Sequence, residues 1–171
     1  MTSFLPLISE LLPMILPSSI HVVRAKDLEP KHPTVEGPVL QRQALVGKCG
    51  MCATVLTIRP HSESAIRHNS EQGVYTSTFQ FSTNGPTDLF EDAIIFLVSG
   101  SGVFLVQGGQ KEGAQRNELT QGDLVFVPSW TEHQLVNETD EDAVWLLIQS
   151  GSRPVGADLT DWGGDEIFTR K

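Results

Sequence analysis

Short apolar runs separated by turn-forming residues dominate the chain from about residue 52 to residue 148. Dense runs cover residues 52–58, 93–98, 102–106, 123–127 and 143–148. Gly, Pro, Asn and Asp residues separate them, and a helix-like pattern is confined to residues 9–16 near the N-terminus. Many short β segments at this spacing are typical of an all-β sandwich or barrel.

The same pattern divides the chain into three parts. Residues 1–38 form an N-terminal arm: a short amphipathic helix at 9–16, in an apolar stretch broken by Pro6, Pro13 and Pro17, and then an extended segment with a loop. Residues 39–150 form the barrel, and the turn-rich residues 151–171 are expected to pack over it as a tail. Because the first residues lack a basic start and include Glu10, we do not expect a secretion signal there.

Composition and charge narrow the class of protein. The chain has 171 residues, 39% hydrophobic and 19% charged, which fits one globular domain. Its 21 acidic against 12 basic residues give a net charge of -9, which repels phosphate backbones and argues against nucleic-acid binding. No run approaches the roughly 18 apolar residues that a membrane span needs, so we expect no membrane partner.

The two cysteines do not point to a metal or redox site. Cys49 and Cys52 stand in a C-G-M-C arrangement that runs directly into a strand-like segment. A zinc site needs two further ligands, and a redox pair is expected between a strand and a helix. We interpret them as two small residues near the start of a strand, in a reducing, cytoplasmic environment.

The segment at residues 122–137, GDLVFVPSWTEHQLVN, carries the chemistry. Pro128 ends one strand because proline cannot donate to a ladder. His133 opens the next strand with its side chain available to the barrel interior, and Asn137 closes it with turn chemistry. This pattern resembles the second motif of the cupin superfamily, with one departure: Trp130 stands where the motif usually has glycine.

A second segment, AIIFLVSGSG at residues 93–102, resembles the end of the first cupin motif. The resemblance implies a double-sheet jelly-roll β-barrel. More narrowly, the strings PHSESAIRH, SEQ and the later Trp-Gly resemble small single-domain fungal cupins of secondary-metabolite gene clusters, including polyketide clusters that make salicylaldehyde-type aromatics. Members of that group are described as cupin-domain oxidoreductases.

Residues 73–91 interrupt the first motif of that narrower group. In the group, Arg-His-His-Gly-Glu-Gln-Asp leads directly into the strand, whereas here 19 residues separate Gln72 from Asp92. Two interpretations stay open. The segment is either a long loop at the barrel mouth or an intron translated in the gene model, and the interruption of an otherwise continuous motif favours the second.

The resemblance implies a divalent metal, Fe(II) first and Mn or Ni next, held by histidines and a glutamate. His133 matches the ligand of the second motif and His68 matches the first histidine of the first motif. Glu71 is the nearest carboxylate. His68, Glu71 and His133 are therefore the predicted metal ligands and catalytic residues.

Three other positions depart from the metal-binding pattern. The second histidine of the first motif would fall on Asn69 or Ser70, and the glutamate would fall on Ala93. Arg67 and Arg153 are candidates for binding a carboxylate or phenolate, although surface solvation is expected for both.

Three functions follow from this pattern. The first is a metal-dependent, dioxygenase-like oxidoreductase that acts on a small aromatic or polyketide intermediate. The second is a metal-free cupin that binds, isomerises or cyclises such an intermediate, and the third is a structural cupin without a ligand. The resemblance also implies a homodimer.

Overall fold

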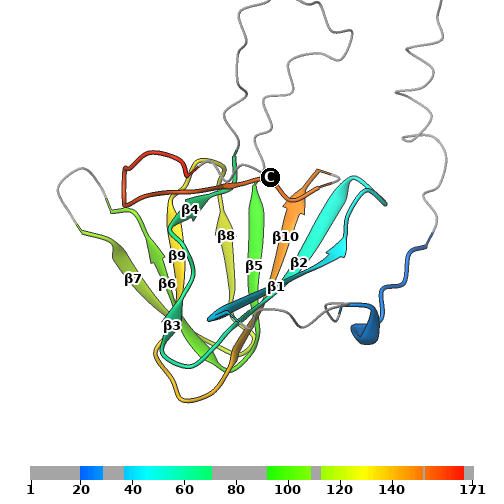
Figure 1. The fold of residues 1–171 in the computed structure, drawn as a ribbon, viewed down its shortest axis with the longest axis horizontal. Coiled ribbons are helices and arrows are strands. Elements are labelled where there is room, and N and C mark those ends of the chain that lie inside the picture. Colours follow the sequence, from blue (N-terminus) through cyan, green and yellow to red (C-terminus); the bar gives the residue numbers. More distant parts are fainter. Residues whose placement is uncertain (1–19, 29–36, 71–91, 109–112, 152, 168–171) are drawn as a thin grey trace, which may run out of the picture.

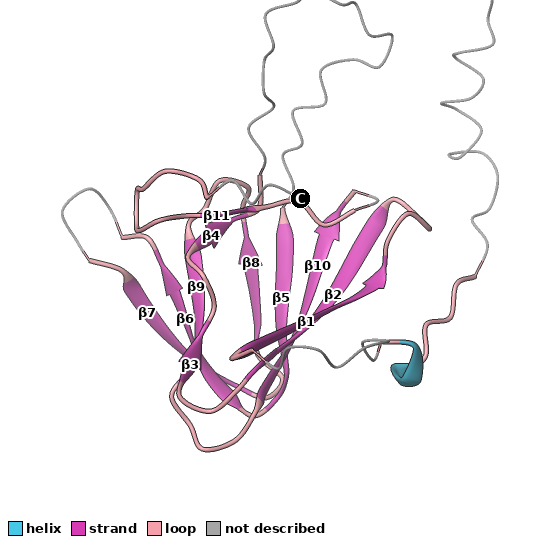
Figure 2. Ribbon diagram, in the orientation of Figure 1, coloured by secondary structure: helices cyan, strands magenta, loops and turns pink. Residues whose placement is uncertain are grey.

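The chain folds into two antiparallel β-sheets that face each other (Figures 1 and 2). The computed structural model describes residues 20–28, 37–70, 92–108, 113–151 and 153–167. The predicted helix at residues 9–16 and the insertion at residues 73–91 lie outside the described residues. Within the described arm the structure has one turn of 3-10 helix, Ala25–Asp27, where an extended segment and loop were predicted.

The first sheet has five strands and carries most of the large apolar side chains. Its order is β1-β2-β10-β5-β8, and every neighbouring pair is antiparallel. The strands are β1 (Val39–Leu45), β2 (Met51–Ile58), β10 (Ala143–Ser150), β5 (Ala93–Ser99) and β8 (Leu124–Val127).

The strands of the second sheet are mostly shorter than those of the first, and their residues are more polar. Its order is β11-β4-β9-β6-β7, and β3 also pairs with β9. Figure 2 shows β4 and β11 crossing the upper end of the barrel, where the C-terminal tail lies. The strands are β3 (Ser62–Glu63), β4 (Arg67–His68), β6 (Ser101–Val106), β7 (Gln115–Thr120), β9 (His133–Asn137) and β11 (Ala157–Asp158).

This architecture is an all-β, double-sheet jelly roll, so the predicted class of the barrel is confirmed. Each of the five predicted apolar runs corresponds to a strand, and the limits agree to within one or two residues. The prediction missed β7, whose sequence QRNELT has no apolar run, and β1, which begins directly after Pro38. Both strands lie at the edge of their sheet, and neither has a fully buried residue. Their sequences therefore lack the strong alternation of apolar and polar residues that burial produces.

The hydrophobic core fills the space between the two sheets. Trp145, Ile95 and Leu97 from the first sheet are fully buried against Phe104 and Leu135 from the second. Trp145 packs so closely over Gly102 that a Cβ there would lie 2.5 Å from the indole ring. The Ser-Gly-Ser-Gly turn therefore needs glycine at this position because of a close approach.

Asn137 ties the end of β9 to two other parts of the barrel. Its Nδ2 group donates to the carbonyl oxygens of Ile58 at 2.9 Å, Arg59 at 3.1 Å and Glu141 at 2.7 Å. Its Oδ1 atom accepts from the backbone N–H and the hydroxyl of Thr139. The predicted turn chemistry of Asn137 is confirmed, and it fixes where β9 ends.

Candidate functional site

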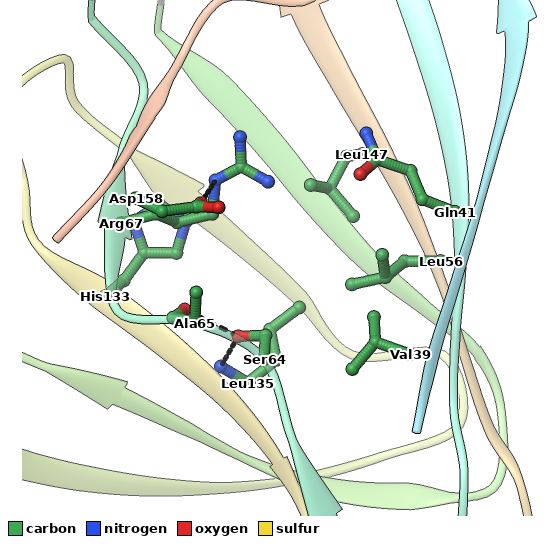
Figure 3. Close-up of a pocket in the computed structure, with 10 residues that line it drawn as sticks. All are labelled: Val39, Gln41, Leu56, Ser64, Ala65, Arg67, His133, Leu135, Leu147 and Asp158. Carbon is green, nitrogen blue, oxygen red and sulfur yellow. Dashed lines mark hydrogen bonds and ion pairs between the residues drawn. The ribbon is translucent and has the colours of Figure 1, made fainter. Parts of the chain in front are cut away.

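A cavity of about 240 Å³ lies inside the barrel between β4 and β9 on one side and β1, β2 and β10 on the other (Figure 3). Its two walls differ in character. Figure 3 shows the charged and imidazole groups together on the side of β4 and β9, opposite the aliphatic groups of the first sheet. The cavity is lined by Val39, Gln41, Leu56, Ser64, Ala65, Arg67, His133, Leu135, Leu147 and Asp158.

His133 enters the cavity as the first residue of β9. Its side chain is buried, and its ring stacks on that of Phe104 at a centroid distance of 5.7 Å. Nδ1 lies 2.9 Å from the carbonyl oxygen of Thr131. Because a carbonyl only accepts, Nδ1 carries the proton and the unprotonated position is Nε2.

The environment of His133 keeps its imidazole neutral. Burial is the largest cause of a shift that lowers its pKa to about 4; the hydrogen bond to Thr131 opposes this shift, and electrostatic repulsion from Arg67 and His68 adds to it. Nε2 is buried and has no hydrogen-bond partner among the described residues. His133 therefore presents a lone pair at Nε2, and its other nitrogen is fixed by a backbone carbonyl, which is the usual arrangement of a metal-binding or acid–base histidine.

Arg67 is the second charged group of the cavity wall. It is the cross-strand partner of His133 in the β4–β9 pair, so both side chains lie on the same face. Its side chain is only 22% exposed, and Nε lies 3.9 Å from Oδ1 of Asp158 on β11. The expectation that Arg67 is solvated at the surface is therefore wrong.

Gly156 makes room for this guanidinium. A Cβ at that position would lie 2.7 Å from Nη2 of Arg67 and 2.8 Å from the carbonyl oxygen of His68. The C-terminal tail thus shapes the cavity in two ways, through the glycine and through Asp158. Nothing in the turn-rich sequence of the tail marked Asp158 in advance, because its role depends on the pairing of β11 with β4.

His68 is not among the residues that line the cavity. Successive strand residues point to opposite faces, and Arg67 already takes the cavity face. The His68 ring instead lies 4.9 Å from that of Trp130, and its Nε2 lies 3.4 Å from Oε1 of Glu166 in the tail. The structure therefore places Arg67, where His68 was predicted, beside His133.

The other predicted metal-site positions do not complete a ligand set in the described structure. Glu71 lies outside the described residues. Ser70 is buried, and its hydroxyl accepts from the N–H of Trp130 at 3.1 Å, whereas Asn69 is buried with an unpartnered Nδ2. Ala93 belongs to the core. Among the residues that the structure describes, no group of three or more His, Cys, Asp or Glu side chains could hold a metal ion.

Trp130 has the backbone conformation of the glycine that it replaces in the motif. Its φ is +63°, in the left-handed region that favours glycine. The indole ring compensates through its contact with His68. Two residues further on, the Glu132 carboxylate accepts from the N–H of Gly163 at 2.7 Å and so holds the tail against the segment before β9.

Comparison with known proteins agrees with the fold. Residues 90–149 match the family described as Cupin domain. The chain is also similar to a gentisate 1,2-dioxygenase from a Streptomyces species, with 34% identity over 83 residues. That match covers 47% of this chain but only 22% of the dioxygenase, so the chain spans a small part of that relative's length.

Solved structures show the same architecture at low sequence identity. Peruvianin-I, described as a cysteine peptidase from Thevetia peruviana latex, has a TM-score of 0.60 and 14% identity over 86% of this chain and 82% of its own. Oxalate decarboxylase from Bacillus subtilis has a TM-score of 0.60 and 16% identity over 80% of this chain and 31% of its own. The family match and the fold together support the cupin superfamily.

Proposed function

We propose that this cupin-fold chain is an enzyme, an oxidoreductase that transforms a small aromatic or polyketide-derived molecule inside the barrel cavity as part of secondary metabolism. The observation that carries the proposal is His133: a buried, neutral imidazole whose unpartnered Nε2 belongs to a cavity of molecular size. Structural histidines in protein cores normally satisfy both nitrogens. The likeness to a gentisate dioxygenase supports enzyme activity of this general kind.

The metal-dependent form of this proposal assigns a divalent ion, Fe(II) first and Mn or Ni next, to His133. When bound, such an ion would activate dioxygen or polarise a phenol or carbonyl of the substrate. The Nδ1–H bond to Thr131 supports a ligand role for Nε2, and Mn(II) centres are named for the oxalate decarboxylase. The described residues bring no second predicted ligand into the cavity, so His68 and Glu71 remain proposed partners of His133.

The protein groups of the cavity have roles of their own. Neutral His133 can accept a proton at Nε2 from a bound hydroxyl group. The aliphatic wall of Val39, Leu56 and Leu147 excludes water and strengthens any charge interaction inside the cavity.

A metal-free function is the second candidate, and the position of Arg67 favours it. A guanidinium beside His133 repels a divalent cation at the same place, whereas it attracts an anionic substrate. In that case the chain would bind, isomerise or cyclise a pathway intermediate with His133 as the proton acceptor.

Elemental analysis after reconstitution with Fe(II) separates the two candidates. We expect about one metal ion per chain in the wild type and loss of that ion in His133→Ala, measured together with a variant that lacks residues 73–91. Metal only in the deletion variant would show that the shorter chain is the working protein. Absence of metal from all three proteins would overturn the metal-dependent form.

Two further expectations stay predictions: a homodimer and a cytoplasmic location. Within the part of the chain that the structure describes, no helix has the length and apolar character needed to cross a membrane.

A further inference from the structure

We propose that the cavity selects a small carboxylic acid, whose carboxylate binds the guanidinium of Arg67 and whose hydroxyl group, where present, donates to Nε2 of His133. The inference names a substrate class for the cavity that the proposed function uses, and it rests on the proposed function only for the choice of this cavity as the binding site. It requires neither a metal nor a particular reaction.

The charges of the cavity wall come from two side chains. Among the described residues, the lining includes one cation, Arg67, and one carboxylate, Asp158, while His133 is neutral. Asp158 is about half exposed, and the 3.9 Å between its Oδ1 and Nε of Arg67 is too long for a hydrogen bond. Asp158 therefore attracts and orients the guanidinium, while the N–H donors of Arg67 stay available to a ligand.

Arg67 offers hydrogen-bond donors that suit a carboxylate. A guanidinium offers five N–H donors in a planar fork that matches a carboxylate. The Nε atom is buried without a hydrogen-bond partner among the described residues. Figure 3 shows the guanidinium extending away from the strand into the cavity toward Leu147 and Gln41. A partly buried cation that faces an aliphatic wall is stabilised when an anion occupies the space between them.

The geometry of Gly156 indicates that the position of Arg67 is built into the fold. The absent side chain at Gly156 leaves the space that Nη2 occupies, since a Cβ there would approach it to 2.7 Å. The cation is thus held from two sides, by the glycine of the tail and by Asp158. A solvated surface arginine would need neither.

His133 supplies a second recognition point. Because Nδ1–H is already bound to Thr131, Nε2 acts only as an acceptor and suits a hydroxyl or amine donor on the ligand. Nearby Ser64 does not compete, because its hydroxyl accepts from the N–H of Leu135 and donates to the carbonyl of Ala65. The polar wall therefore offers one cationic donor group and one neutral acceptor.

The size of the cavity limits the ligand. A volume of about 240 Å³ lies just below the roughly 300–1,000 Å³ that is typical of small-molecule pockets, so it suits a small ligand. A single-ring acid such as benzoate or a hydroxybenzoate fits this space, with its ring against Leu56 and Leu147. The net charge of -9 gives anions no long-range attraction to this chain, so Arg67 must supply the local attraction.

The test compares an acid with its neutral counterpart. Benzoate, 3-hydroxybenzoate and benzamide are titrated calorimetrically into the full-length chain, stripped of metal with a chelator. We expect benzoate to bind roughly 10- to 100-fold more tightly than benzamide, the range given by charge-assisted hydrogen bonds. Arg67→Gln should remove this preference, and Arg67→Lys should keep part of it because lysine retains the charge but not the fork.

Arg116→Gln is the matched control, because Arg116 is an arginine on β7 that pairs with Glu138 and does not line the cavity. It should bind benzoate as the wild type does. His133→Ala should reduce the gain that the hydroxyl of 3-hydroxybenzoate adds over benzoate, without changing the preference for benzoate over benzamide.

Several outcomes would overturn the inference. Equal affinity for benzoate and benzamide would do so, as would no binding of either, or a preference that survives in a folded Arg67→Gln variant. If Arg67→Gln fails to fold, the affinities for benzoate and benzamide are compared in Arg67→Lys instead, and an undiminished preference for benzoate there would overturn the inference. Arg67-dependent binding without turnover or metal uptake would contradict the proposed oxidoreductase function and leave the acid site intact.

Discussion

Strands β9 and β4 lie side by side in one sheet, and each carries a histidine predicted to bind metal, yet the two histidines are placed differently. His133 of β9 faces the cavity with a free Nε2, whereas His68 of β4 packs between Trp130 and Glu166 of the tail. The cavity position on β4 belongs to Arg67. Of the two predicted metal ligands on these neighbouring strands, His133 therefore lines the cavity, and His68 lies one residue beyond the position on β4 that does.

The difference comes from how firmly each strand is positioned by local sequence. β9 follows a strand end at Pro128 and ends at Asn137, whose side chain makes three backbone contacts. β4 has only two residues, and its face is decided by pairing with β9 and β11. A shift of one residue moves every side chain of a strand to the other face, so a short strand without local markers is easily assigned the wrong face.

The largest expected effect concerns the burial of His133. Its pKa is about 4 in the folded protein and about 6.5 when unfolded, so the unfolded state binds the extra proton between these pH values. Above about pH 6.5, His133 is neutral in both states and does not lower the free energy of unfolding. On acidification to pH 4, the unfolded state takes up a proton that the folded state binds poorly, and the free energy of unfolding falls by about 3 kcal/mol.

Urea unfolding of metal-free protein at several pH values checks this. His133→Asn keeps a donor near Nδ1 but has no titrating group, so its unfolding free energy should fall by about 3 kcal/mol less than that of the wild type between pH 7 and pH 4. Parallel pH profiles for the two proteins would show that His133 is not buried in its neutral form.

Asn137→Ala tests the fixed end of β9. The change removes the Nδ2 donor from three backbone carbonyls, and buried acceptors left without partners cost roughly 2 kcal/mol in total. Denaturant unfolding should show this loss without a change in the m-value. Glu138→Gln, at the exposed neighbouring position, is the control and should change stability by less than about 0.5 kcal/mol.

Arg67→His tests the face of β4 directly. Because Arg67 is the cross-strand partner of His133, a histidine there places two imidazoles on one face, with Cβ atoms roughly 5 Å apart. We expect Ni(II) affinity to rise at least about tenfold, or ~1.4 kcal/mol, over the wild type by calorimetry.

His68→Ala is the contrasting variant for that experiment. If His68 lies outside the metal-accessible cavity, its removal should leave Ni(II) binding unchanged in both the wild type and Arg67→His. A loss of affinity as large as that of His133→Ala would restore His68 to the metal site and contradict the comparison of the two strands.

The smallest effect concerns the turn that separates β8 from β9. Trp130 has a φ of +63°, which costs a non-glycine residue roughly 1 kcal/mol. Trp130→Gly and Trp130→Ala both lose the ring contact with His68, so their difference isolates the backbone. Thermal or urea unfolding should find the glycine variant more stable by about 1 kcal/mol, and equal stabilities would remove the argument for strain.

Much of the fold was predictable because the strands of the first sheet carry apolar residues on both faces, although only the face toward the core is fully buried. Strands β2, β5 and β10 are continuous hydrophobic segments, and the prediction found all three. The polar outer strand β7 left no such pattern. For the site, only His133 had a local signature, namely the proline before its strand and the asparagine that ends it.

Sequence alone determined the fold class, the strands of the core and the position of His133, because each depends on contacts within a few residues or on periodic burial. Only the tertiary structure decided that Arg67 rather than His68 faces the cavity, and that Asp158 and Gly156 of the tail complete its wall. These contacts join segments about 90 residues apart, and they depend on which strands pair and on which face each side chain then occupies.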